Sequence, residues 1–142
     1  MISILDLIKE VLTPSPDYLK LIDKIKEEGG IFLGSGDYGS VYQVGDVVKK
    51  VTSDEVELEH AEILKGKSTK YFVPILDVEV ISPKLGIITM PNMEKYSGDI
   101  SEDFIEALEQ EAEQIGIDPD ELDIRPDNFM IDQKGDLKMT DV

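Results

Sequence analysis

The apolar residues of the first thirty positions recur at the spacing of an α-helix. They predict a helix over residues 1–12, which is ended by the two prolines of the TPSP stretch that follows. A second helix is predicted to begin at Pro16, with Ser15 as its cap, and to stop at a Gly-Gly pair. We interpret residues 1–30 as an N-terminal helical extension that packs on the rest of the chain.

From position 31 the hydrophobic period changes to two, which is typical of β-strands. Three short strands joined by glycine-bearing turns are predicted between residues 31 and 51, and two more in the stretches YFVPILDVEVI and LGIITM. Between these groups a capping-box pattern, with Thr52 as the cap and Glu55 three residues later, predicts a helix that closes at Gly66. The inner face of this helix is expected to carry Glu57, Ala61 and Leu64.

The last third of the chain is predicted to hold one long helix and two short strands. Ser101 caps a helix over residues 101–115, with Gly116 beyond its end. A polar segment, IDPDELDIRPDN, then leads into the strands FMID and LKMT, which a QKGD turn joins. The fold class is therefore predicted to be α+β, with a five-stranded antiparallel sheet and few helices.

Composition narrows the function classes. The 142 residues include 31 acidic and 14 basic side chains, so the net charge is 14 − 31 = −17, which argues against binding to nucleic acid or to an anionic membrane. There is no cysteine, and His60 is the single histidine, which excludes disulfides and multi-histidine zinc sites. The start of the chain lacks a basic leader and no apolar run is long enough for a membrane span, so we expect a cytoplasmic protein.

One glycine-rich stretch carries candidate chemistry. Gly34, Gly36, Gly39 and Val41 form the pattern G-x-G-x-x-G-x-V between two predicted strands. A hairpin tip of this kind can lay backbone N–H groups over phosphates, whereas a dinucleotide fold would need a helix after the glycines. The same pattern also occurs in ordinary glycine-rich turns, so this stretch alone leaves both interpretations open.

A lysine on the third strand is the candidate phosphate-binding cation. Alternation along the strand allows only Lys49 or Lys50 to point inward, and an inward Lys50 shares its face with Val48. The following helix offers Glu57 or Glu59 as a carboxylate partner that would hold the lysine extended. The alternative interpretation is that both lysines are solvent-exposed on an edge strand and that the acidic residues form the solvent-exposed face of the helix.

The segment DIRPDN at 123–128, together with MTD at 139–141, resembles the signature of the protein kinase superfamily. The first block is similar to the catalytic loop D-L-K-P-x-N, and the second to the strand that leads into D-F-G. Their separation, 141 − 128 = 13 positions, is typical of such kinases. The glycine stretch, the strand lysine and the acidic helix occur in the same order as in these kinases, so the resemblance covers residues 31–142. The domains that the chain resembles are of the Ser/Thr kinase and aminoglycoside-phosphotransferase types.

The resemblance implies roles for the matching residues. Asp123 corresponds to the catalytic aspartate that orients the acceptor hydroxyl, and Arg125 stands where these enzymes usually place a lysine near the transferring phosphoryl group. Asn128 and Asp141 correspond to ligands of Mg²⁺. Lys50 and Glu57 would form the ion pair at the phosphates.

The resemblance also implies a place for the adenine of ATP. The stretch GIITMPNM is similar to the end of the fifth strand and the hinge of these enzymes. Adenine would meet the backbone carbonyl of Pro91 and the amide of Met93, and proline is compatible with the first role because only its carbonyl is required.

The implied organisation is an N-terminal extension at 1–30, a kinase-like N-lobe at 31–93 with one αC-type helix, and a minimal C-lobe at 94–142. The implied function is ATP-dependent phosphoryl transfer with Mg²⁺ to an unspecified acceptor; the alternative is a pseudokinase-type acidic module that binds a protein partner without turnover. Glu121 and Leu122 replace the histidine and arginine that normally precede the catalytic aspartate, and we expect no activation segment after Asp141. We expect the N-terminal helices, a partner or a second copy to cover the reduced C-lobe.

Overall fold

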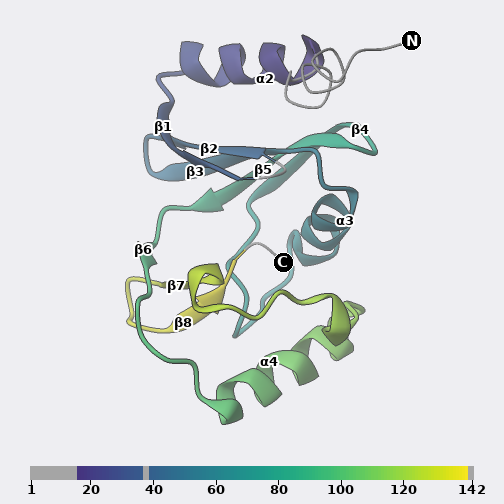
Figure 1. The fold of residues 1–142 in the computed structure, drawn as a ribbon, viewed down its shortest axis with the longest axis vertical. Coiled ribbons are helices and arrows are strands. Elements are labelled where there is room, and N and C mark those ends of the chain that lie inside the picture. Colours follow the sequence, from purple (N-terminus) through teal and green to yellow (C-terminus); the bar gives the residue numbers. More distant parts are fainter. Residues whose placement is uncertain (1–15, 37–38, 141–142) are drawn as a thin grey trace, which may run out of the picture.

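The computed structural model describes residues 16–36 and 39–140 and has a layered arrangement (Figure 1). A five-stranded antiparallel sheet, as predicted, has the order β1-β2-β3-β5-β4. One helix lies on its outer face, another on its inner face, and a small three-stranded sheet and a final helix lie below. The five strands are β1 (Ile31–Ser35), β2 (Gly39–Val44), β3 (Val47–Thr52), β4 (Asp77–Ser82) and β5 (Leu85–Pro91).

Helix α2 (Pro16–Glu27) covers the outer face of the five-stranded sheet (Figure 1). Its buried residues, Leu21, Ile22 and Ile25, lie on one side of the helix, in agreement with the helical spacing of apolar residues in the sequence. The cluster that it forms with the sheet comprises Leu21, Ile22, Ile25, Tyr42, Val51, Leu85 and Ile87. For α2 this corrects the expectation that the N-terminal helices cover the C-terminal part, because the buried residues of this helix pack on the five-stranded sheet. The helix predicted over residues 1–12 lies outside the described residues.

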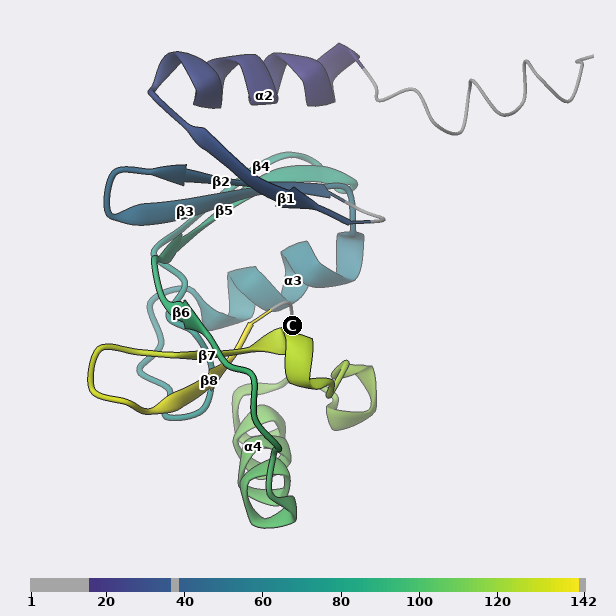
Figure 2. The same ribbon diagram turned by 60° about the vertical axis from the view of Figure 1, so that its left-hand side comes forward.

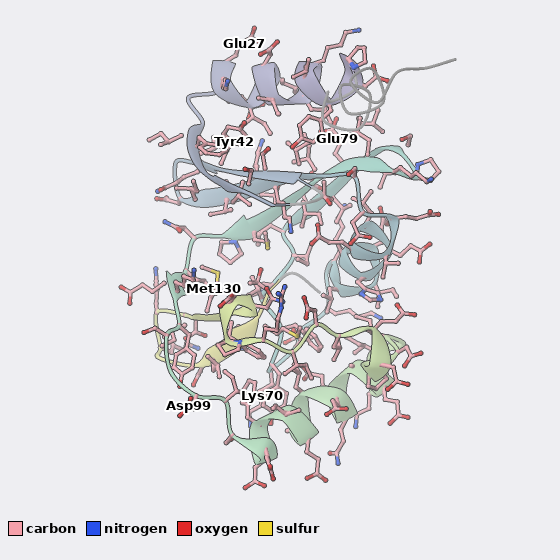
Figure 3. The ribbon with its side chains drawn as sticks, in the orientation of Figure 1. Glu27, Tyr42, Lys70, Glu79, Asp99 and Met130 are labelled. Carbon is pink, nitrogen blue, oxygen red and sulfur yellow. The ribbon has the colours of Figure 1, made fainter. Side chains whose placement is uncertain are left out.

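Tyr42 lies between α2 and the sheet (Figure 3) and is only 4% exposed. Burial raises the pKa of its phenol above the ordinary value of 10.0. Two residues earlier on the same strand, the hydroxyl of Ser40 shares a hydrogen bond of 2.6 Å with the hydroxyl of Tyr18 of α2. The helix is therefore joined to the sheet by polar as well as apolar contacts.

Helix α3 (Glu55–Leu64) lies under the inner face of the sheet. Its cap is Asp54, whose carboxylate accepts a hydrogen bond of 3.0 Å from the backbone N–H of Val56. The prediction that Thr52 caps this helix is wrong, because Thr52 still pairs with Gly86 in the sheet and its hydroxyl accepts from the N–H of Asp54 at 3.1 Å, not from an N–H of the helix. Leu58, Ala61 and Leu64 are buried on the side of α3 that faces the protein.

The stretch YFVPILDVEVI forms a strand only from Asp77 onward. Pro74 has no N–H to donate, and the segment before β4 turns away from the sheet. It pairs instead with the end of the chain, where the N–H of Val73 donates to the carbonyl of Met139 at 2.9 Å and the N–H of Met139 donates to Tyr71 at 2.7 Å. This segment therefore connects the upper and lower parts of the molecule.

The lower part holds α4 (Glu102–Ile115) and a three-stranded sheet of β6 (Glu94–Lys95), β7 (Phe129–Ile131) and β8 (Leu137–Met139). Ser101 caps α4, and Gly116 ends it with a φ of +92°, which favours glycine. The core here contains Leu64, Phe72, Leu108, Ala112, Ile117, Leu122, Phe129 and Met139. No helix among residues 16–36 and 39–140 is long and apolar enough to cross a membrane.

The burial of α2 generates a stability prediction. Ile25 is 1% exposed, so replacing it with alanine should lower the free energy of unfolding by about 2–5 kcal/mol through lost burial and a cavity. Leu19, on the same helix and 47% exposed, is the matched control, and Leu19→Ala should change stability by about 0.5 kcal/mol or less. Urea unfolding followed by circular dichroism measures both, and equal effects would show that α2 does not pack as described.

Candidate functional site

A cleft lies between the five-stranded sheet above and the three-stranded sheet with its preceding loop below. Figure 2 shows the two sheets facing each other across this region, with β6 descending along one side from the end of β5. The cleft has two adjoining cavities of about 640 Å³ and 350 Å³. Cavities of this size can hold a small-molecule ligand. The larger one is lined mainly by polar and charged groups, and the smaller one mainly by apolar side chains.

The glycine-rich hairpin between β1 and β2 forms the upper rim. The N–H of Gly36 donates to the carbonyl of Gly39 at 2.9 Å and closes the turn, whose residues 37 and 38 lie outside the described residues. A Cβ on Gly39 would collide with the backbone carbonyl of Val51 on β3, so this glycine is needed for strand packing. A Cβ on Gly34 or Gly36 would meet no described atom within 4 Å, and both residues line the larger cavity.

Lys50 points from β3 into the cleft. Its Nζ lies 2.7 Å from the Glu57 carboxylate on α3, and the two side chains are only 15% and 11% exposed. Lys49 points the other way and pairs with Glu28 at 2.8 Å, and this contact lowers the pKa of the Glu28 carboxyl. The alternation of β3 and the packing of α3 thus bring Lys50 and Glu57 together, whereas Glu59 is exposed.

The lower rim is formed by two short 3₁₀ turns, η1 (Pro119–Glu121) and η2 (Pro126–Asn128), and the residues between them. The Asp123 carboxylate pairs with the Arg125 guanidinium at 2.7 Å, and both side chains are more than half exposed. The buried Asn128 donates from its Nδ2 to the backbone carbonyl of Asp123 at 2.8 Å. The side chain of Asn128 therefore holds the backbone that carries Asp123.

The smaller cavity is an apolar slot between the two sheets. Leu33, Val41 and Val48 line it from the five-stranded sheet, and Met130 of β7 lines it from below. Figure 3 shows Met130 in the region between the sheets. The chain leaves β5 along this slot, with Pro91 paired to Val47 and the N–H of Asn92 donating to Asp46 at 3.2 Å.

Sequence reasoning missed several residues of this cleft. The hydrophobic pattern offered no reason to select Leu33, because an irregularity in β1 after Phe32 breaks the simple alternation. Met130 and Lys95 are brought to the cleft by the pairing of β6 with β7. That pairing involves a two-residue strand, which is too short to give a pattern. Val48 was not missed in this way, since alternation already places it on the same face as an inward Lys50.

The residues proposed to hold a cation are only partly within the described region. Asn128 lines the larger cavity, and because its amide nitrogen is bonded to Asp123, its amide oxygen remains for another partner. Asp141 lies outside the described residues. Among residues 16–36 and 39–140, no group of three or more histidine, cysteine, aspartate or glutamate side chains is arranged to hold a metal ion.

Comparisons with known proteins give structural but not sequence matches. No protein-family model matches the chain, and no curated protein sequence matches it. Among solved structures, the chain is similar to Rad53 (1–466) in complex with AMP-PNP, with a TM-score of 0.56 and 16% identity over 86% of this chain and 42% of that one. It is also similar to the CAK complex from Chaetomium thermophilum bound to ATP-gamma-S, with a TM-score of 0.54 and 16% identity over 91% of this chain and 50% of that one.

Both of these structural neighbours are protein kinases, so the chain has a protein kinase-like fold. It spans half or less of the length of the two matched chains. At this level of identity the similarity establishes the fold alone. The chemistry of the cleft has to be argued from its own residues.

The glycine geometry predicts different effects at two neighbouring positions. Gly39→Ala should destabilise the protein by about 1–3 kcal/mol, because the new methyl group forces β2 away from the carbonyl of Val51. Gly36→Ala, which meets open space, should cost about 0.5 kcal/mol or less. Thermal unfolding of both variants tests this, and a Gly36 variant that is as unstable as the Gly39 variant would contradict the described packing.

Proposed function

We propose that this protein binds ATP with Mg²⁺ in the cleft between its two sheets and transfers the γ-phosphoryl group to an acceptor hydroxyl. The observation that supports this most directly is that one cavity is lined by Gly34, Gly36, Lys50, Asp123 and Asn128. Phosphoryl transfer needs groups that donate hydrogen bonds to the phosphates, a cation, and a carboxylate near the nucleophile. It needs little covalent chemistry from the protein. The kinase-like fold supports the same proposal.

In this proposal the triphosphate lies under the glycine-rich hairpin. Gly34 and Gly36 leave open space where side chains would otherwise stand, so phosphate oxygens can approach the backbone of the hairpin closely. Lys50 supplies a positive charge to the phosphates, and Glu57 holds its ammonium group extended into the cleft at 2.7 Å. Because both side chains are mostly buried, their attraction is screened less than that of a surface pair.

The adenine is assigned to the apolar slot next to the phosphate site. Its faces would pack between Leu33 and Val41 above and Met130 below, all of which line the slot. The edge of the ring would meet the backbone carbonyl of Pro91 and the amide N–H of Met93, which also line it. These two backbone groups can distinguish adenine from other bases by one acceptor and one donor.

The cation is assigned to the amide oxygen of Asn128, with Asp141 as the second protein ligand. Oxygen donors are the ligands that Mg²⁺ prefers, and it keeps several waters and phosphate oxygens around it. When bound, Mg²⁺ would neutralise charge on the phosphates. Asn128 would at the same time keep its hydrogen bond to the Asp123 carbonyl, so that one side chain orders both the cation site and the catalytic loop.

Asp123 is assigned as the residue that accepts the proton of the acceptor hydroxyl. The bond between the γ-phosphorus and its bridging oxygen breaks, a bond from the acceptor oxygen to this phosphorus forms, and ADP leaves. Arg125, 2.7 Å from Asp123, is assigned the role of stabilising negative charge on the phosphoryl group in transit. Both residues are more than half exposed, so an acceptor has open access to them.

Lysine variants test the nucleotide site. Lys50→Met should weaken binding of Mg-ATP by about 10-fold or more, because it removes the buried cation that faces the phosphates. Lys49→Met is the matched control on the adjacent residue, whose ammonium pairs with Glu28 on the other face, and it should leave affinity unchanged. Isothermal titration calorimetry measures both. Equal losses in the two variants, or no binding by the wild type at millimolar ATP, would refute the assignment.

An aspartate variant tests transfer separately from binding. Asp123→Asn should lower kcat by about 10²-fold or more, because the amide cannot accept the proton, while ATP affinity stays near that of the wild type. The assay follows ADP release with hydroxyl-bearing acceptors, and Asp127→Asn on the same loop is the control. Equal turnover in the wild type and Asp123→Asn would remove the catalytic role.

A second candidate function is an acidic interaction module that binds a protein partner without turnover. The observation that favours it is a groove on α4 and the following turn, bordered by Glu102, Glu106, Glu109 and Glu113. Such a surface is complementary to a basic partner. A second copy of the chain is the other partner that we consider, although a net charge of −17 opposes self-association. A wild-type protein that binds ATP but never consumes it would favour this second function.

A further inference from the structure

The single histidine of the chain links α3 to the loop that carries Asp123. His60 lies on α3, and its Nε2 is 2.8 Å from the Glu121 carboxylate at the end of η1. The imidazole is only 5% exposed, whereas the Glu121 side chain is 48% exposed. The contact joins residues that are 61 positions apart in the sequence. It is therefore a tertiary contact between two elements of the cleft.

The hydrogen bonding of the ring fixes its orientation. A carboxylate accepts hydrogen bonds, so Nε2, the ring nitrogen that faces Glu121, is assigned as the donor of this contact. The other ring nitrogen, Nδ1, is buried and makes no hydrogen bond with any residue in the described part of the chain. A flipped ring would place a carbon atom opposite Glu121 and lose this bond. Glu121 is thus the partner that holds the imidazole in one position.

The place of His60 on the helix connects it to both sides of the cleft. Glu57 and His60 are three residues apart and share one face of α3. Through Glu57 this face contacts Lys50 on the sheet, and through His60 it contacts Glu121, two residues before Asp123. A single turn of α3 thereby contacts Lys50 of the sheet on one side and Glu121 of the lower rim on the other.

We propose that His60 is a positioning residue, which sets the place of the Asp123 loop relative to α3 and Lys50. Its effect on phosphoryl transfer rests on the proposed function. Glu121 stands where the resembled kinases carry the histidine that braces this loop. In this protein the loop carries a carboxylate at this position, and α3 supplies the histidine that contacts it. Leu122, 9% exposed, fixes the loop to the lower core, but its contacts are apolar and it lacks this directional bond to α3.

The test compares two substitutions of one side chain. His60→Leu keeps an apolar group of moderate size but removes the donor, whereas His60→Gln keeps an N–H₂ group that can reach Glu121. Glu59→Gln is a control on the exposed side of the same helix. Hydrogen exchange of the backbone amides in residues 119–125, where every residue except Pro119 has an N–H, reports the position of the loop. The kcat and the ATP dissociation constant report the site.

We expect His60→Leu to speed exchange in residues 119–125 by about 10-fold, as for loss of one buried hydrogen bond, while exchange in β2 and β3 stays unchanged. The same variant should lower kcat by about 10-fold with ATP affinity within about twofold of the wild type, because a displaced carboxylate affects transfer more than binding. His60→Gln should restore both quantities to within about threefold of the wild type, and Glu59→Gln should change neither.

Three results would overturn the proposal. They are unchanged exchange in residues 119–125 of His60→Leu, faster exchange throughout the molecule, and a His60→Gln variant as defective as His60→Leu. The exchange measurement decides the positioning role even in a protein without turnover. A wild type that binds no ATP, or never transfers phosphate, would refute the proposed function alone, so the two failures are distinguishable.

Discussion

The buried ion pair between Lys50 and Glu57 is the constraint on which the arrangement of the cleft depends. Removing two charges from water is costly, and the cost is offset only when the pair has good geometry, as at 2.7 Å here. The pair therefore fixes α3 against the inner face of the sheet. It also fixes the sense of β3, because an inward Lys50 requires Val51 to face outward, where it lies in the core under α2.

The layers on either side of the cleft each have a core of their own, which explains why a small chain can hold a cleft. The central strands of the sheet are covered on the outer face by α2 and on the inner face by α3. The edge strands β1 and β4 still expose apolar side chains such as Phe32 and Val80. The lower part adds a separate core around Phe72, Leu108 and Phe129. Two carboxylates of the lower part contact the segments that connect it to the sheet. Glu111 of α4 accepts from the backbone N–H groups of Lys70 and Tyr71, and Glu121 contacts His60 of α3. The cleft is the space between two such stabilised layers.

Much of the fold could be predicted because it follows local periodicity. The alternation of β2, β3 and β5 and the stripes of α2 and α4 each identify an element and its buried face. Three features could not be predicted locally. Asp54 rather than Thr52 caps α3 because Thr52 is retained by sheet pairing, the segment around Pro74 leaves the sheet to pair near Met139, and α2 covers the outer face of the sheet. Each depends on partners distant in sequence.

The candidate site shows the same division between local and distant information. The motif order brought Gly34, Lys50, Glu57, Asp123 and Asn128 into consideration, and the structure brings them to one cavity. Leu33 and Met130 could not be predicted from the pattern. The register of β1 shifts after Phe32, beside Leu33, and Met130 is positioned by the pairing of β7 with the two-residue strand β6. His60 escaped as well, since a histidine on an apolar helix face is usually a core residue. Only the proximity of Glu121 distinguishes it.

The most direct test of the central claim, that nucleotide binds between the two sheets, uses the methionine methyl groups as probes. The chain has five methionines, of which Met90, Met93 and Met130 line the apolar slot and Met139 is buried in the lower core. Met90 is only 8% exposed. In a methyl NMR titration with Mg-ATP, the account predicts the largest shifts at Met93 and Met130, a smaller one at Met90 and little change at Met139. Saturating nucleotide that leaves Met93 and Met130 unshifted, or shifts Met139 most, would contradict it.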